Sequence, residues 1–532
     1  MKNYFKLFQV GIMMLTIMIL ASCSTEKSEL TAIPNDAGFV LVVDGKALHE
    51  KANTKNVTES EAYKKLLNKF TTEELKDFKQ FEYIFEDPKE SGIAIDGEFI
   101  AFVKMEEGEP VLGVNFLVTD KSKVDSLFAK VVDNEKTDVK IITEDGISFI
   151  TDKDDHAVIA WNEHQLLMYA QQDVAGEALV NAAKTLLNQT TSKSIFANSI
   201  YTDFYANKKD ISVWFNYDLF LDNMPPAQQM MMSSSLPFSF KGTYFYAYTS
   251  FEKGQVVVEY ESIMNDEMKD YLKKYQMIND DFDTDVLKML PKTSYANFEM
   301  SLNLYNYYHM FLDMYKEKQV NTDMYTKQIE DELGMTLDDL LNSFSGEMAI
   351  SLHGFEIDSA NTKLEPLFSA IIKYNSDELW DILEKRAGEM GFKKENGYYT
   401  IDMAHVYLAY VNSTMVISND ESYISDLIKN GSVDPNMEST DIAKHLGDFP
   451  AYMEIDMNLD NYQTELQDLL KQQGNKYSPE LYDILNTYQR LQVLPTSNTS
   501  AKMVLQLKDD SKNSLEVIIN SMSDAVDVLS EN

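Results

Sequence analysis

A short strand-like unit that ends in Asp or Asn with a Leu close behind recurs along the chain, and it constrains the fold more than any other feature. Its copies are IPNDAGFVLVVDGKAL from Ile33, ISVWFNYDLFLDN from Ile211, LPKTSYANFEMSLNLYNYY from Leu290 and FPAYMEIDMNLDNY from Phe449. Apolar and polar residues alternate in the last two copies, which predicts strands whose apolar face, with Phe298 and Met453, is buried. Residues 39–43 are apolar on both faces and should form a central strand. A repeated strand unit predicts a repeated sheet.

A second set of matching segments supports a duplication of the whole chain. The matching parts are residues 112–120 with 367–375, the helices predicted at 123–131 and 377–388, and three short strands after each helix. His156 and His405 begin matching strands, and Ala160-Trp161 corresponds to Ala409-Tyr410 at the same spacing. We interpret both histidines as strand-start residues.

The sequence therefore predicts an α+β protein with two related lobes from a tandem duplication, each a mostly antiparallel sheet with helices packed on it. The predicted parts are a lipoprotein signal peptide (1–22), a lipidated Cys with a flexible tether (23–32), an N-terminal α+β lobe (33–265), a helical linker (266–289) and a C-terminal α+β lobe (290–532). Inserted helices are expected at about 60–86 and 303–344. Each half should end in paired strands, 243–249 with 255–261 and 501–507 with 515–520.

The N-terminus has the pattern of an exported lipoprotein. Lys2 and Lys6 precede an apolar run at 10–20, which ends in Leu20-Ala21-Ser22-Cys23. The run has the length of a signal-peptide core, roughly 7–15 residues, and is shorter than the about 20 residues of a spanning helix. Cys23 is the only cysteine of the chain. We therefore expect a lipid anchor on Cys23 and a place in the cell envelope, with the outer membrane favoured and its periplasmic or outer surface left open.

The composition limits the classes of partner that the protein can bind. The formal net charge is −39, which repels nucleic acid and bare anionic membranes and otherwise favours solubility. A single lipidated cysteine leaves no disulfide, so the fold must depend on its core, for which 44% hydrophobic residues suffice.

The lipobox, the segment from Ile33, the segment DPKESGIAIDGEFIAFV from Asp87 and the recurring strand units together resemble an uncharacterised family of Bacteroidota lipoproteins, domain of unknown function 4836. The resemblance covers essentially the whole mature chain. It implies an outer-membrane or periplasmic lipoprotein, and it brings no activity, cofactor or catalytic residue.

Motifs for catalysis or metal binding are absent from the sequence. Asp281, Asp283 and Asp285 have the spacing that opens a calcium loop, but Val286 and Lys292 replace its required Gly and Glu. We interpret Asp283 or Asp285 as a cap of the following helix. Nucleophile, phosphate-loop and metal-histidine motifs are also missing. No catalytic residue, cofactor or metal ligand is predicted.

Two apolar segments remain. Met230, Met231 and Met232 form a possible apolar contact site, because methionine adapts to varied partners, although a gap-filling role is favoured. The aromatic residues between Tyr305 and Phe311 have helical spacing and should belong to a core.

The sequence favours a non-catalytic binding or scaffold protein for a protein, glycan or apolar partner. Alternatives are an envelope glycan hydrolase that uses paired carboxylates, and a periplasmic carrier of an apolar ligand. A hydrolase needs two carboxylates about 5–10 Å apart in a cleft. A carrier needs an enclosed apolar cavity of hundreds of Å³.

Overall fold

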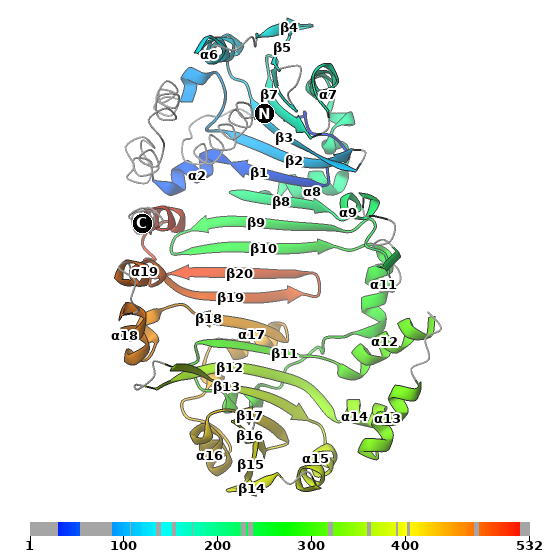
Figure 1. Ribbon diagram of the computed structural model, residues 1–532, viewed down its shortest axis with the longest axis vertical. Helices are drawn as coiled ribbons and strands as arrows, with labels where there is room; N and C mark the ends of the chain where they lie inside the picture. Colours follow the sequence, from blue (N-terminus) through cyan, green and yellow to red (C-terminus); the bar gives the residue numbers. More distant parts are fainter. Residues whose placement is uncertain are drawn as a thin grey trace. The chain divides into compact units, whose positions relative to one another are not determined.

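The computed structural model describes residues 30–53, 88–106, 108–134, 140–151, 156–172, 174–223, 225, 230–231, 238–317, 323–358, 363–389, 392–401, 405–472 and 478–521. The predicted signal peptide, Cys23, the helix expected near 60–86 and Met232 lie outside these residues. The chain divides into two compact units (Figure 1). Unit 1 takes its described residues from 30–225, 240–264 and 509–521, and unit 2 takes its own from 230–239 and 265–508.

Unit 1 contains an antiparallel sheet in the order β4-β5-β6-β7-β3-β2-β1-β8-β9-β10. Its strands are β1 (Phe39–Asp44), β2 (Glu98–Glu106), β3 (Glu109–Leu117), β4 (Ile142–Glu144), β5 (Ile147–Ile150), β6 (Ala157–Trp161), β7 (Gln165–Gln171), β8 (Ile211–Asn216), β9 (Tyr244–Glu252) and β10 (Gln255–Ile263). The predicted central place of residues 39–43 is confirmed, because β1 lies between β2 and β8.

Unit 2 contains an antiparallel sheet in the order β14-β15-β16-β17-β13-β12-β11-β18-β19-β20. Its strands are β11 (Ala296–Ser301), β12 (Phe344–Asp358), β13 (Lys363–Tyr374), β14 (Lys393–Glu395), β15 (Tyr398–Ile401), β16 (Val406–Val411), β17 (Thr414–Ser418), β18 (Ala451–Asp456), β19 (Tyr488–Ser497) and β20 (Ser500–Leu507). The order repeats that of unit 1 with every strand number raised by ten. Antiparallel sheets combined with helices confirm the α+β class.

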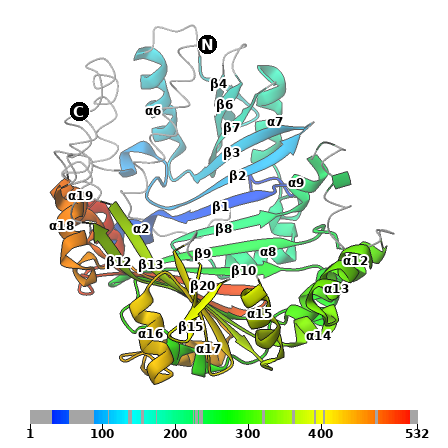
Figure 2. The same ribbon diagram turned by 60° about the horizontal axis from the view of Figure 1, so that its bottom comes forward.

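Helices complete both units (Figures 1 and 2). Unit 1 has α2 (Gly45–Ala52), η2 (Pro88–Ser91), α6 (Lys121–Asn134), α7 (Glu177–Leu187), η3 (Thr191–Lys193), η4 (Ile195–Ala197), α8 (Ser199–Ala206), α9 (Asp218–Asn223) and a helical segment at 514–521. Unit 2 has α11 (Asp266–Tyr275), η5 (Thr284–Met289), α12 (Leu304–Glu317), α13 (Asp323–Leu333), α14 (Leu337–Asn342), α15 (Glu378–Glu389), α16 (Glu421–Asn430), η6 (Met437–Ser439), α17 (Ile442–Asp448), η7 (Leu459–Asn461), α18 (Thr464–Gln472) and α19 (Ser478–Leu485).

The recurring Asp or Asn of the repeated unit is a helix cap. Asp44 ends β1 and accepts a hydrogen bond from the Ala47 backbone N–H (2.9 Å), so α2 begins there. Asn303 follows β11 and accepts from the backbone N–H of Asn306 in α12, also at 2.9 Å. Asn458 caps η7 after β18 in the same way. The repeated unit is therefore a strand followed by a capping residue, and the Leu lies in the helix that the cap begins.

The core of unit 2 covers one face of its sheet. The turns η5 and η6 and the helices α16 and α17 contribute buried side chains such as Leu287, Ile424 and Leu446. They pack against sheet residues that lie in one row across neighbouring strands, including Ala349, Ile371, Val416 and Tyr452. In unit 1, α7, α8 and η4 pack on the sheet in a corresponding core.

Three sequence predictions about secondary structure and packing are wrong. Residues 514–521 form a helix where 515–520 was expected to be a strand, because Asn513 caps its start and Leu515 and Ile519, one turn apart, pack into a core of unit 1. The aromatic residues of α12 do not lie in a core, since Tyr307 is exposed and Tyr305, Tyr308 and Phe311 are only partly buried. The apolar faces of β11 and β18 are not the buried ones, as described below.

Candidate functional site

The sheet of unit 2 exposes apolar side chains at its centre. Ile350 in β12 is 54% exposed, Phe298 in β11 is 39% exposed and Met453 in β18 is 36% exposed. Phe298 stands directly opposite Ile350 on one side and Met453 on the other, so the three side chains form a row on one face. The prediction that this face is buried is wrong.

Two further rows extend this apolar surface on the same three strands. Met300 lies between Met348 and Ala451, and Ala296 lies between Leu352 and Ile455. Each of these residues is partly exposed. We call these nine residues the open face. None of the nine carries a charge or a hydrogen-bonding side chain.

The open face continues onto both neighbouring strands. Val493 and Leu491 of β19 stand opposite Met453 and Ile455, and Ala370 of β13 stands opposite Ile350. Farther along, Trp380 of α15 packs with Tyr410 of β16, toward the β14 end of the sheet. The apolar surface is therefore covered toward that end and exposed at its centre.

The opposite face of β11 buries a carboxyl group. Glu299 is 0% exposed and lies in the covered row between Ala349 and Tyr452. Neither of its carboxylate oxygens has a hydrogen-bond partner within the part of the chain that the structure describes. Burial, and then the nearby Glu454, raise the pKa of Glu299 well above its usual value. Burial therefore favours the protonated, uncharged form of Glu299 in the folded protein.

Glu454, by contrast, is held by several donors. Arg490 Nη1 lies 3.2 Å and Gln492 Nε2 lies 3.0 Å from Glu454 Oε2, and the Tyr452 hydroxyl donates to the same oxygen. Burial and the charge of Glu454 raise the pKa of Tyr452, so this phenol stays protonated and remains a donor. The two glutamates thus have different surroundings, because Glu454 has three hydrogen-bond donors and neither oxygen of Glu299 has a partner among the described residues.

Two neighbouring carboxyl groups in unlike surroundings resemble the acid and base of a glycosidase, but Glu299 is not accessible. A glycosidase needs both carboxyl groups to face a cleft that admits a sugar chain. Glu299 lies beneath the helical layer with no exposed surface. Glu299 is therefore closed to a polysaccharide.

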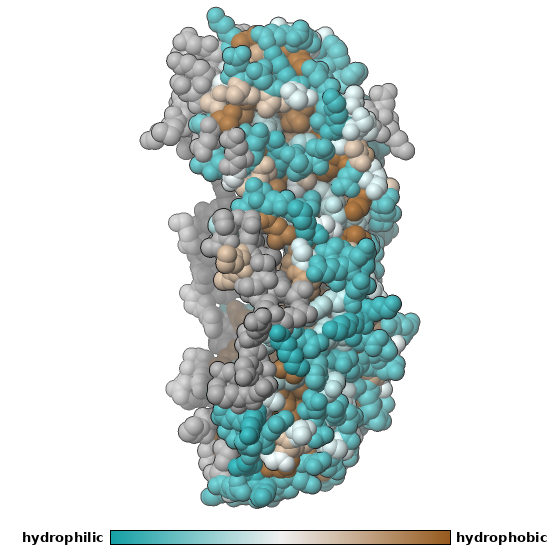
Figure 3. All heavy atoms as spheres, turned by 90° about the vertical axis from the view of Figure 1, so that its right-hand side faces the viewer, coloured by the Kyte–Doolittle hydropathy of each residue, from teal (hydrophilic) through white to brown (hydrophobic). Residues whose placement is uncertain are grey.

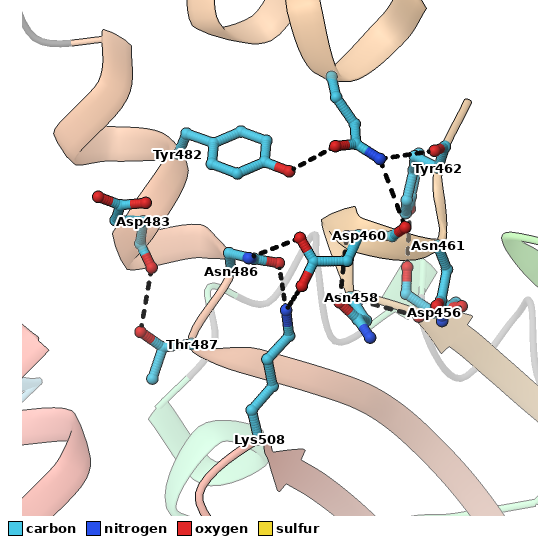
Figure 4. Close-up of polar contacts among 11 residues, drawn as sticks. Asp456, Asn458, Asp460, Asn461, Tyr462, Tyr482, Asp483, Asn486, Thr487 and Lys508 are labelled. Atoms are coloured by element: carbon cyan, nitrogen blue, oxygen red, sulfur yellow. Dashed lines mark hydrogen bonds and ion pairs between the residues drawn. The ribbon is translucent and has the colours of Figure 1, made fainter. Parts of the chain in front are cut away.

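A polar network joins the segment after β18 to α19 and β20 (Figure 4). Lys508 Nζ lies 2.6 Å from both Asp460 Oδ2 and Asn486 Oδ1, and Asn486 donates to Asp460 Oδ1 at 3.1 Å. The hydrogen bond from Lys508 lowers the pKa of Asp460. Asn461 donates to Asp456 (2.7 Å). Lys508 and Asn461 bind these carboxylates. The network therefore links the segment after β18 with the residues that follow α19 and β20.

A second candidate site among the described residues is a small polar pocket. A pocket of about 210 Å³ in unit 2 is lined by Asp285, Lys288, Lys373 and Thr414 among others, so it is neither apolar nor large. Lys288 and Lys373 each form an ion pair with an aspartate beside it. No group of three His, Cys, Asp or Glu side chains in the described ranges is placed to hold a metal ion.

The residues singled out from the sequence have separate places. Met230 and Met231 are exposed on a short helical segment, whereas Cys23 and Met232 lie outside the described residues. Asp283 accepts a hydrogen bond from the Asp285 backbone N–H and caps η5, as interpreted. His156 and His405 directly precede β6 and β16.

On the face shown in Figure 3, hydrophilic residues prevail and hydrophobic ones are scattered among them. Within the described ranges, every helix is too short or too polar to cross a membrane.

Comparison with known proteins gives a family but no activity. Crystal forms IV and III of TP0453 are each 8% identical to this chain, with a TM-score of 0.26. The two matches cover 44% and 48% of this chain and 81% and 88% of the respective TP0453 chains. Similarity at this level carries no argument about fold or function. No curated protein matches the chain significantly. A family model matches residues 30–515, and the chain therefore belongs to the family described as "Domain of unknown function (DUF4836)".

Proposed function

We propose that the protein is a lipid-anchored cell-envelope lipoprotein that acts as a non-catalytic binding or scaffold protein, with the open face as its binding surface for an apolar partner. The observation that carries the proposal is the exposure of Ile350, Phe298 and Met453 at the centre of a sheet. Apolar surface in water costs about 25 cal/mol per Å², and a continuous exposed apolar patch is typical of a binding surface.

The alternatives fit the described residues less well. A hydrolase with paired carboxylates would need access to Glu299, which is fully buried. A carrier with an enclosed apolar cavity would need a larger and less polar space than the 210 Å³ pocket. A glycan partner would need hydrogen-bonding side chains, which the nine residues of the open face do not offer.

The same proposal includes a tandem duplication as the origin of the two units. Its support is the identical strand order, together with equal register at matched positions. Ala160 pairs with Phe149 and Leu167, and Ala409 pairs with Tyr398 and Val416 at the same spacing. Pro34 and Pro291 precede β1 and β11 by equal distances, and each forms an isolated antiparallel bridge.

The binding surface can be tested with Nile red, an uncharged dye that fluoresces in apolar surroundings. We expect the full chain to bind the dye and Ile350→Glu to lose at least tenfold in affinity, because the charge must be desolvated beneath the dye. Leu485→Glu on α19 is the matched control, since Leu485 is also exposed, at 49%. Equal dye binding by wild type and Ile350→Glu, or no binding by wild type, would contradict the proposal.

The anchor can be tested by labelling cells with radioactive palmitate. The wild-type chain should incorporate the label, and Cys23→Ala should not. Protease treatment of intact cells, with a periplasmic protein as control, then decides which side of the outer membrane carries the protein. A wild-type chain without label would refute the lipoprotein assignment.

A further inference from the structure

The chemistry of the open face restricts its partner. Its nine side chains are aliphatic, methionine or phenylalanine. They can therefore make favourable contacts only with apolar groups such as hydrocarbon chains. The backbone offers nothing more, because β11 is hydrogen-bonded to β12 on one edge and to β18 on the other. A peptide strand therefore cannot add to the sheet at this place.

A folded protein partner also fits this surface poorly. Protein interfaces carry about one hydrogen bond per 100–200 Å² in addition to their apolar contacts. The three rows of the open face supply no donor or acceptor from their side chains. Met300, Met348 and Met453 are unbranched and adaptable, which suits a partner of variable shape such as a flexible hydrocarbon chain.

The matching surface of unit 1 differs at its centre. Counted from Pro34 as Phe298 is counted from Pro291, Leu41 takes the place of Phe298, and it pairs with Ala101 and Val213. Ala101 and Val213 are smaller than Ile350 and Met453, and all three residues of this row are only partly exposed. Leu41 also packs against a core to which α2, α6 and the segment 514–521 contribute. At the position of Phe298, unit 1 thus has less exposed side chains, although Leu112 of β3 in the next row is 41% exposed.

Charge restricts the headgroup. The chain has a net charge of −39, so an anionic lipid is repelled as it approaches. Toward the end of the β12–β13 hairpin, Glu356 and Glu365 stand opposite each other and are exposed. A zwitterionic or uncharged headgroup avoids this repulsion.

We propose that the open face of unit 2 binds the acyl chains of a single membrane lipid with a zwitterionic headgroup. This inference rests on the proposed function, since it assigns a ligand class to the same surface. The acyl chains lie across β12, β11 and β18 on the rows centred on Phe298, and the headgroup stays in water.

The test is photo-crosslinking of the full chain, with phosphatidylcholine that carries a diazirine in its acyl chain, presented in phosphatidylcholine vesicles. Mass spectrometry should place the crosslinks on peptides that contain β11, β12 and β18. Ile350→Glu and Met453→Glu should each reduce these crosslinks at least tenfold, and Leu485→Glu should leave them unchanged. Vesicles of phosphatidylglycerol with the matching probe should give several-fold fewer crosslinks.

The possible failures are distinguishable. If Nile red binds the open face but no lipid crosslink maps to these strands, the lipid inference fails and the proposed function stands. If neither probe reaches the open face, both fail. If crosslinks persist in Ile350→Glu and Met453→Glu, the lipid is held elsewhere and the inference is overturned. If phosphatidylglycerol crosslinks as strongly as phosphatidylcholine, the choice of headgroup is wrong.

Discussion

Replacing Glu299 by Gln removes a buried carboxyl group while it keeps the size and shape of the side chain. The pKa of Glu299 is raised by burial and by Glu454. Between the unfolded pKa of about 4.3 and this raised value, the folded protein holds a proton that the unfolded chain has released. The contribution of Glu299 to stability is therefore fully present below the unfolded pKa and is lost as pH rises through this window.

The magnitude follows from that one proton. The free energy of unfolding of the wild type falls by up to about 1.4 kcal/mol per pH unit in this window because of Glu299. From pH 5 to pH 7 the release of this one proton can account for a loss of at most about 3 kcal/mol. Glu299→Gln has no proton to release, so its advantage over the wild type should grow with pH across the same range.

The assay is urea unfolding of both proteins at pH 5, 6 and 7, with hydrogen exchange of peptides from β11 and β18 as a readout specific to unit 2. Glu395→Gln is the matched control, because Glu395 is exposed on β14. Parallel pH profiles of wild type and Glu299→Gln would refute the reasoning, since they would mean that Glu299 ionises equally in the folded and unfolded states.

Three further substitutions test the packing. Asp44→Ala removes the cap of α2 and should lower the free energy of unfolding of unit 1 by about 1 kcal/mol, with faster hydrogen exchange at the start of α2. Unchanged exchange there would contradict the capping role. Gly254→Ala should destabilise by about 1 kcal/mol or more in urea unfolding, because Gly254 has φ of +67° and the added Cβ would lie 2.7 Å from the Asp510 Cα. Leu515→Ala should cost about 2–5 kcal/mol in the same assay, because Leu515 is buried in a core of unit 1. A cost below about 0.5 kcal/mol would indicate that the 514–521 helix is not docked there.

Local pattern determined much of the secondary structure. The alternation around Phe298 and Met453 predicts β11 and β18, and the apolar run at 39–43 predicts the central strand β1, because strand periodicity is a property of consecutive residues. The helix predicted at 123–131 lies within α6, and the helix predicted at 377–388 matches α15 to within one residue at each end. The repeated Asp and Asn residues marked the starts of helices, although their capping role became clear only in the structure.

The candidate surface could not be predicted in the same way. A period of two separates Phe298 from Glu299 onto opposite faces, but it does not say which face the helices cover. That choice is made by η5, η6, α16 and α17, which come from other parts of the chain and pack over the face of Glu299. The same coverage leaves Phe298 exposed beside Ile350.

Contacts between segments that are far apart in the sequence also decided the remaining features. Glu299 and Glu454 meet because β11 and β18 are neighbours in the sheet, and no short-range pattern records that contact. The strand-like sequence at 515–520 is helical because Leu515 and Ile519 are buried on one side of a helix in unit 1. The sequence by itself determined most of the strand and helix segments and the family, since these depend on patterns of residues near one another in the chain. Only the tertiary structure decided which faces are buried, because burial depends on segments that are far apart in the sequence.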